Sequence, residues 1–349
     1  MRPTWPRQPI ERWMRNASAQ LQWLGQSSLA VTLSRTLRTP DTSYITSLRS
    51  GWFDYAAEEL QASSWWAAWG VRRLGTGARW LGLDRLVLVG NWPVSTNVWN
   101  AASGDALSQA CTLALAQSPN CFVAVRNLQA SKHAELMATL RGLGFVALPA
   151  RVVYEFDLRQ GLARKPSHLT RDHTARKRSG LKVSVIQHAT PQTSRRLAAL
   201  YTRIYLDKHS QLNAQYTPEF FEDMLNEKVM RALLLTHSNG STMAFAMLYQ
   251  VGDTLTVPAL GYATDTEIDG LYRLLFSAIH DYTQTHALLL NYSSGAGDFK
   301  RKRGGVPQLE YTMVCAPSKK ANGWRAQLLR WLEKRTQGID AAALMALGA

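Results

Sequence analysis

LLLNYSSGAGDFKRKRGGVPQLEY, residues 288–311, is the stretch from which the fold can be worked out. The apolar run 288–290 predicts a buried strand, and residues 309–315 predict a second strand. Between them lies a loop with four glycines and four consecutive cations. Such a loop can bring backbone amides and ammonium groups up to an anionic group. The alternative is a solvated charge run without a role.

The first half of the chain alternates strand and helix patterns. One helix is marked by Ser131 as its N-cap and by Gly144 as its stop. The order of elements predicts a mixed α/β layer. The expected strands are 86–90, 121–125, 145–148 and 152–158, and the expected helices are 104–117 and 131–143.

The second half repeats this kind of pattern. Thr217, Pro218 and Glu219 have the order cap, first-turn proline and acid that begins a helix. Thr264 and Glu267 have capping-box spacing before a further helical stripe. The other expected elements are strands 183–186 and 232–235, the helix 193–208, and a hairpin of strands 243–250 and 254–262 that Pro258 interrupts.

Composition predicts a globular, basic protein. Hydrophobic residues make up 46% of the 349, and the apolar runs are broken before the roughly 18 residues that a transmembrane helix needs. The net charge of +15 favours an anionic partner, namely nucleic acid, an anionic membrane face or coenzyme A. Cys111, Cys121 and Cys315 have no metal-ligand spacing, so we expect small buried hydrophobes in a cytoplasmic protein and no metal site.

Two segments are rich in cations. Residues 164–182 are the most basic tract, which a solvated helix face or a phosphate-contacting patch would explain. Residues 52–80 interleave tryptophan with arginine, as a membrane interface or a nucleic-acid surface would, but we expect an aromatic core and its rim. The expected domains are an N-terminal basic helical segment 1–45 with a helix over 10–33, a first half 46–160, a basic linker 161–182, a second half 183–318 and a C-terminal helix 319–349.

The span 86–315 resembles the tandem GNAT-type N-acyltransferases, the group that includes the Fem-type peptidyltransferases (FemA, FemB and FemX-like) and their small-molecule relatives. The resemblance is carried by RGLGFVALPARVVYEFDL at 141–158, LYTRIYLDKHSQLNAQYTPEFFEDML at 200–225 and GAGDFKRKRGG at 295–305. It implies two GNAT-like halves, each a mixed, mostly antiparallel sheet flanked by helices. Phe299 and Lys300 resemble part of a phenylalanine, lysine and glycine element whose lysine faces the acyl donor in Fem-type enzymes.

The resemblance implies transfer of an acyl group from a thioester, acyl-CoA or acyl carrier protein, to a small amine or amino-acid acceptor. No tightly bound cofactor is expected. Single-domain GNAT enzymes have a glycine-rich pyrophosphate cradle after the hairpin, whereas this chain has ATDTEIDGLYR at 263–273, with one glycine and three acids. This departure favours a carrier-protein thioester or an aminoacyl-tRNA. The alternatives are therefore a Fem-like aminoacyl-tRNA-dependent transferase and a non-catalytic binder of nucleic acid or a membrane surface, with peripheral contact through residues 52–80.

Acyl transfer needs a positioned carbonyl, a base for the acceptor and donors for the developing oxyanion. Lys300 is the expected cation near that oxygen, or else one of four solvated cations. His209 is the candidate base, although an exposed loop histidine usually has no role. The expected catalytic residues are Lys300, Tyr262, Asp265 and His209; the substrate-binding residues are Asp207, Lys208, Ser210, Asn213, Tyr292, Ser294 and Phe299; and the donor-binding residues are Gly295, Ala296, Gly297, Arg273 and Arg301.

The sequence makes one direct prediction about this loop. We expect Lys300→Ala to abolish transfer and to leave the melting temperature nearly unchanged, because a loop lysine at an active centre contributes charge rather than packing. Full activity in that variant would mean that the loop is not the active centre.

Overall fold

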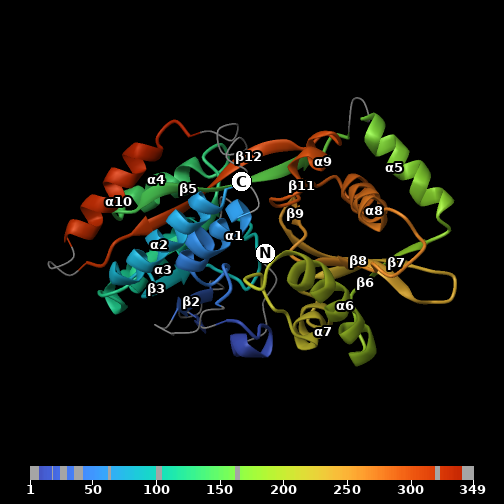
Figure 1. Cartoon of the computed structure of the whole chain (residues 1–349), viewed down its shortest axis with the longest axis horizontal. Helices are drawn as coiled ribbons and strands as arrows, with labels where there is room; N and C mark the ends of the chain where they lie inside the picture. The colour runs from blue at the N-terminus through green and yellow to red at the C-terminus, as the bar shows by residue number, and fades with distance from the viewer. Residues whose placement is uncertain are drawn as a thin grey trace. The chain divides into compact units, whose positions relative to one another are not determined.

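The structure, a computed structural model, has two compact units (Figure 1). Unit 1 consists mainly of Val153–Gln211 and Gln215–Gln308, and unit 2 mainly of Pro9–Val152 with the chain from Leu309 onward. Strands β5 (Val146–Asp157) and β12 (Val306–Cys315) carry the chain from one unit to the other. The structure describes residues 8–17, 19–23, 30–34, 42–61, 64–99, 104–161, 166–318 and 323–339.

The sheet of unit 2 is mixed and mostly antiparallel. Its strand order is β1-β2-β3-β4-β12-β5. The β3–β4 pair is parallel, whereas β1–β2, β2–β3 and β4–β12 are antiparallel. The strands not yet given are β1 (Ala19–Trp23), β2 (Ala30–Ser34), β3 (Leu86–Val89) and β4 (Phe122–Leu128).

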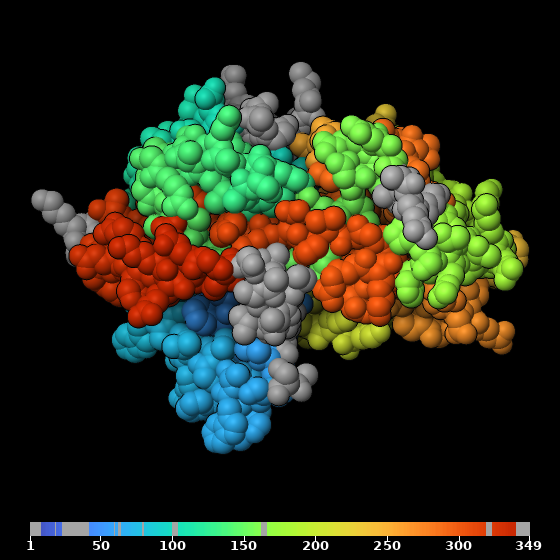
Figure 2. Space-filling view, turned by 90° about the horizontal axis from the view of Figure 1, so that it is seen from above, coloured from blue at the N-terminus to red at the C-terminus, as the bar shows by residue number. Residues whose placement is uncertain are grey.

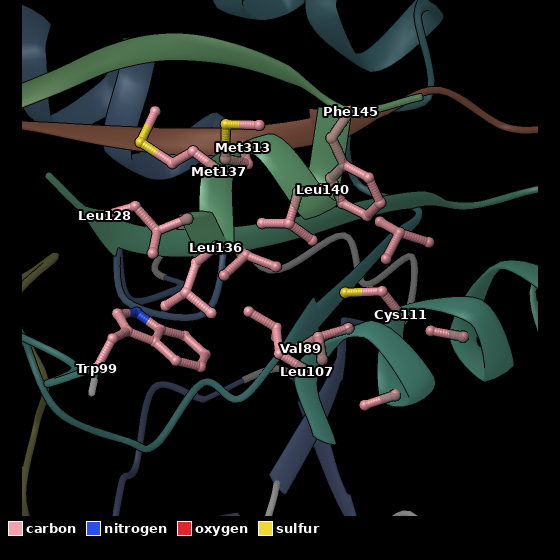
Figure 3. Packing of buried hydrophobic residues seen from close by; sticks show 14 of the residues in the cluster. Val89, Trp99, Leu107, Cys111, Leu128, Leu136, Met137, Leu140, Phe145 and Met313 are labelled. Carbon is pink, nitrogen blue, oxygen red and sulfur yellow. The ribbon is translucent and has the colours of Figure 1, made fainter. Parts of the chain in front are cut away.

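Successive side chains of a strand point to opposite faces of the sheet. The strands of unit 2 have apolar side chains on both faces, and helices cover each face. Val87 and Val89 belong to a core cluster with α3 (Gly104–Gln117) and α4 (Ala134–Gly142), shown in Figure 3. Leu86 and Leu88 belong to a second cluster. That cluster includes residues of α2 (Trp65–Trp80) and α10 (Gly323–Thr336), and the short segments η2 (Ser50–Tyr55) and α1 (Ala56–Gln61) precede α2.

Unit 1 contains strands whose arrangement is again mixed and mostly antiparallel. Their order is β5-β11-β9-β8-β7-β6, with β10 on β8, and β9–β11 is their parallel pair. The predicted hairpin is confirmed, and Pro258 lies between β9 and β10, where the second strand is interrupted. The bounds are β6 (Lys182–Ile186), β7 (Arg231–Thr236), β8 (Thr242–Val251), β9 (Thr254–Thr256), β10 (Leu260–Tyr262) and β11 (Leu289–Asn291).

Of the two helix starts predicted from capping residues in unit 1, one is confirmed and the other is wrong. The Thr217 hydroxyl accepts from the Phe220 N–H at 3.4 Å, which confirms the predicted cap. The predicted capping box at Thr264 is wrong, because the last long helix starts only after Gly270, whose φ is +70°. The helices are α5 (Ser167–Arg178), α6 (Pro191–Ile204), the π-helix η4 (Tyr205–His209), α7 (Pro218–Asn226), α8 (Leu271–Thr285) and the short α9 (Gly297–Arg301).

Four further expectations need correction. The helix expected over 10–33 is a short 3₁₀ turn and the strands β1 and β2, whose alternating polar and apolar residues suit a sheet. Residues 161–182, expected as a linker, contain helix α5 and the start of β6. The strands expected over 145–148 and 152–158 are the single strand β5, since proline tolerates extended backbone. Helix α4 begins at Ala134, after a turn that includes Ser131.

The tryptophans of residues 52–80 do not form the expected core. Trp52 is half-buried against the second core cluster of unit 2, but the tryptophans of α2 are exposed. Helix α2 is attached to its unit through small residues, Ala68, Gly75 and Ala78, so its large side chains lie on the other side.

The fold class predicted from the sequence is confirmed: a mixed α/β protein with a large, mostly antiparallel mixed sheet flanked by helices. No helix in the described part of the chain has the length and apolarity to cross a bilayer. Cys111 is buried as expected, and burial raises the pKa of its thiol to about 12, whereas Cys121 and Cys315 are half-buried.

Leu140 tests the packing of unit 2. Its side chain is fully buried in the cluster of Figure 3, so Leu140→Ala should lower the free energy of unfolding by about 2–5 kcal/mol through lost burial and a new cavity. Leu113→Ala, at an exposed position of α3, is the matched control and should change it by less than about 0.5 kcal/mol. Urea denaturation measures both, and equal effects would contradict the packing.

Candidate functional site

Lys300 is buried and holds the loop that precedes it. Its side chain is 2% exposed, and its ammonium donates to the carbonyl oxygens of Tyr292 at 2.7 Å, Ser293 at 3.1 Å and Ser294 at 2.8 Å. The ammonium also lies 4.9 Å from the ring centroid of Tyr292 and 5.6 Å from that of Tyr154. An ammonium has three N–H donors, so direct contact with an oxyanion would require one of these bonds to break.

The loop between β11 and α9 has an uncommon backbone. Ser293, Gly295 and Ala296 all have positive φ, which costs free energy for the two residues that are not glycine. Gly297 is needed for space, since a Cβ there would lie 2.3 Å from the Tyr154 hydroxyl. The cation of Lys300 thus stabilises a backbone conformation that the loop sequence alone does not favour.

A buried ion pair attaches α5 to the far side of this element. The Arg303 guanidinium donates to Asp172 of α5 at 2.5 Å, and both side chains are almost fully buried. The same guanidinium lies 3.5 Å from the ring centroid of Phe299 and donates to its carbonyl at 3.0 Å. Both groups are needed, because either charge alone would be costly in this interior.

Aromatic side chains surround the loop. The Phe299 ring lies 4.8 Å from that of Tyr272 and 5.4 Å from that of Phe276. The Phe276 ring in turn lies 5.1 Å from that of Tyr292, edge to face. Phe299 and Tyr292, both predicted to bind substrate, therefore lie in one aromatic cluster with two residues of α8.

The phenols of this cluster remain protonated at neutral pH. Burial raises the pKa of Tyr272 to about 12 and raises that of Tyr292 well above its usual value. The Tyr292 hydroxyl is fully buried, and its hydrogen-bonding interaction with Tyr272 falls outside the ordinary geometry of a hydrogen bond. Buried hydroxyls are nearly always hydrogen-bonded, and an exception is often functional.

Two other predicted residues lie in the same region. The Tyr262 ring is 6.0 Å from that of Tyr272, and Tyr262 and Tyr205 both contribute to the raised pKa of Tyr292. The His209 ring is 6.4 Å from that of Tyr205. Partial burial, and then Lys208, lower the pKa of His209, so its imidazole is neutral at pH 7.

The other predicted residues are more dispersed. Asp265 is exposed and accepts from Arg203 at 2.5 Å, which holds the pKa of Asp265 below its usual range. The Arg273 side chain folds over Gly270, and the Arg301 guanidinium donates to the Tyr154 hydroxyl at 2.9 Å. Asp207 and Lys208 are exposed and Ser210 is buried. Asn213 belongs to unit 2, and its carbonyl accepts from Asn16 of the same unit at 2.8 Å.

The sequence analysis missed the residues that support this site. Tyr154, Tyr205 and Tyr272 come from separate elements and carry no local motif, and Asp172 lay unnoticed in the basic tract. A buried network in unit 2 was also missed: Glu310, 1% exposed in its side chain, accepts from Arg151 at 2.8 Å and from Asn127 at 2.7 Å. Burial lowers the pKa of Arg151, but Glu310 together with Tyr44 and Tyr55 more than offsets this effect, so the pKa is raised.

One cluster in unit 1 has metal-ligand types. His173, His280 and Asp281 offer ligand atoms within 4.8 Å of one another. However, the Asp281 carboxylate is in an ion pair with the Arg176 guanidinium of α5. That guanidinium supplies the positive charge a metal ion would bring, so the residues present form an α5–α8 contact rather than a metal centre.

Comparison with known proteins supports a likeness in fold. No family model matches the sequence, and a comparison with curated proteins finds no match. The structure is similar to the C-terminal domain of a protein assigned as a lysylphosphatidylglycerol synthetase from Agrobacterium fabrum, with a TM-score of 0.53 and 13% identity over 94% of this chain and 91% of that one. It is also similar to L-PGS from Bacillus licheniformis, with a TM-score of 0.54 and 11% identity over 90% and 89% of the two chains.

More distant neighbours include FemX, at a TM-score of 0.49 and 10% identity over 66% of this chain and 79% of that one. A tandem GNAT protein from the clavulanic acid biosynthesis pathway is more distant still, at a TM-score of 0.38. The names of these two neighbours belong to the two classes that the sequence resembled, Fem-like and tandem GNAT-type proteins. At such low identities, likeness of structure establishes the fold alone.

The buried ammonium changes the stability expected for a Lys300 variant. Lys300→Met keeps the volume of the side chain but leaves three carbonyls without their donor, so the free energy of unfolding should fall by about 3 kcal/mol. Lys302→Met is the matched control, since Lys302 is exposed and pairs at the surface with Asp298, and its stability should not change measurably. Denaturant unfolding measures both, and an unchanged Lys300→Met protein would contradict the arrangement.

Proposed function

We propose that the protein is a transferase that moves an aminoacyl group from an aminoacyl-tRNA to a nucleophile on a second substrate. The likeness to the lysylphosphatidylglycerol synthetase domain supports this, because it covers more than nine tenths of both chains. The product in that protein's name is phosphatidylglycerol carrying a lysyl group, which is the result of aminoacyl transfer. The GNAT-like fold supports the coarser statement, acyl-group transfer.

The charge distribution favours a tRNA donor over coenzyme A. The net charge is +15, and helix α5 places Arg171, Lys177 and Arg178 on its exposed side, where they can contact phosphates. The connection from β10 to α8, where a pyrophosphate cradle would lie, instead exposes the acids Asp265 and Glu267.

The chemistry follows from the aromatic cluster. The acceptor nucleophile attacks the ester carbonyl carbon, the bond to the terminal ribose oxygen of the tRNA breaks, and that oxygen takes up the proton the nucleophile loses. Tyr292 and Tyr272 are protonated at neutral pH and can donate hydrogen bonds to the oxyanion. Neutral His209 is the candidate base. Lys300 acts as a positioning residue, because it fixes the carbonyl of Tyr292 and those of the two residues that follow it.

The same site would also serve an acyl thioester, which is the second candidate donor. Thioesters and aminoacyl esters both present an activated carbonyl to the nucleophile, and the GNAT-like fold favours this candidate. The acceptor is a small amine, an amino acid or a lipid head group, and the transfer assay that identifies the donor also distinguishes these acceptors.

Tyr292→Phe separates catalysis from stability. It removes a buried hydroxyl without an ordinary partner and keeps the ring, so kcat should fall by about 100-fold while the melting temperature stays the same or rises slightly. Transfer of radiolabelled amino acid from a charged tRNA mixture into acceptor provides kcat, and thermal unfolding provides stability. Tyr282→Phe, which lies on α8 and outside the cluster, is the matched control and should keep full activity.

The donor is identified in the same preparation. A tRNA affinity that falls steeply with salt supports the aminoacyl-tRNA reaction, whereas an increase in melting temperature with coenzyme A supports the thioester reaction. Binding of either without turnover would mean that the protein is a non-catalytic binder. Wild-type kcat in Tyr292→Phe would place the reaction elsewhere.

A further inference from the structure

The exposed tryptophans of the described residues all lie on two helices of unit 2. Helix α2 has four and helix α10 has two, and their exposure ranges from 48% to 87%. Both helices pack on the same face of the sheet, since both contribute to the cluster around Leu86 and Leu88. They are Trp65, Trp66, Trp69 and Trp80 on α2, and Trp324 and Trp331 on α10.

The α2 tryptophans share one side of their helix. Trp65 and Trp69 are four residues apart and so neighbours on the helix surface, and the Trp66 ring stacks on that of Trp65 with centroids 3.6 Å apart. The opposite side packs through small residues, and a Cβ at Gly75 would lie 2.7 Å from the Phe53 Cβ. Figure 2 shows the light blue segment that includes α2 standing out from its unit.

Cations lie among these rings. The Arg73 guanidinium is 5.2 Å from the Trp69 ring centroid, and the Arg335 guanidinium is 5.4 Å from that of Trp331. Helix α2 contains no acid. The acid of α10, Glu333, already accepts from Arg141 at 2.6 Å and from the Ala147 N–H at 2.9 Å. The surface formed by the exposed sides of α2 and α10, here called the tryptophan face, is therefore aromatic and cationic.

We propose that the tryptophan face docks on the surface of an anionic lipid bilayer. Tryptophan is amphipathic and prefers the interface between head groups and acyl chains, and arginine beside it complements anionic head groups. Helix α2, with 16 residues, is too short to span a bilayer, so it would lie in the plane of the interface. A face of this kind left in water is also unusual for a soluble surface.

The chemistry of the face favours lipid over other partners. The phosphates of a nucleic acid would bind the arginines, but only unpaired bases of a single strand could stack on the six indole rings. A protein partner would need acids placed against each arginine. An anionic bilayer matches both features at once, because its charge and its apolar layer are adjacent at every point of its surface.

Vesicle binding of the full chain, without any donor, tests the proposal independently of the proposed function. We expect co-sedimentation with vesicles of phosphatidylcholine and phosphatidylglycerol, much weaker co-sedimentation with phosphatidylcholine alone, and quenching of tryptophan fluorescence by brominated lipid. Absence of binding to the anionic vesicles at low salt, or binding without quenching, would overturn the proposal. The quenching experiment uses the unaltered protein and so does not depend on how a variant folds.

Variants locate the contact. Trp66→Ser with Trp69→Ser should weaken binding to anionic vesicles by at least about tenfold, because two interfacial rings are lost. Leu113→Ser, an exposed apolar position on α3 at the other face of the sheet, is the matched control and should bind as the wild type does. Equal binding by all three proteins would show that this face is not the contact, and capture of a protein or an RNA in place of lipid would likewise overturn the proposal.

Discussion

The site of unit 1 depends on the three hydrogen bonds that the buried Lys300 ammonium donates to backbone carbonyls. Three successive backbone carbonyls, from Tyr292 to Ser294, converge on one buried cation. Convergent carbonyls repel one another and are tolerated in an interior only when a donor satisfies all of them. The positive φ at Ser293 is part of the backbone conformation that brings these carbonyls together. The ammonium therefore determines where the Tyr292 side chain lies, and the rest of the aromatic cluster packs around it.

This arrangement divides the roles of the basic run between support and contact. Lys300 and Arg303 are buried, one holding the loop and the other joining Phe299 to Asp172 of α5. Lys302 is exposed and pairs with Asp298. Four consecutive cations thus have unequal surroundings, because a short helix turns successive side chains to different sides. The groups left for chemistry are phenols, which the low-dielectric surroundings keep protonated.

Unit 2 is organised around two core clusters, one on each face of its strands. Its two core clusters alternate along β3 and β4 to opposite faces of the sheet, and the helices on one face keep their largest side chains outside. A buried ion pair between Arg151 and Glu310, with Asn127, ties β4, β5 and β12 together. Unit 2 thus has large apolar side chains at its surface and charged side chains in its interior, the opposite of the ordinary pattern. The buried arginine is stabilised by a carboxylate. Under our proposal, a bilayer covers the exposed tryptophans.

The sequence by itself determined the fold class, the hairpin interrupted by Pro258, the cap at Thr217 and the strand, loop and strand order around residues 288–311, because periodicity and turn chemistry are local. It also pointed to Phe299 and Tyr292. Only the tertiary structure decided that Lys300 is buried, that the helix within 161–182 packs into unit 1, and that the α2 tryptophans are exposed. Burial depends on which elements pack together, and Tyr154, Asp172 and Tyr272 reach the site from distant positions in the chain. No local pattern contains that information.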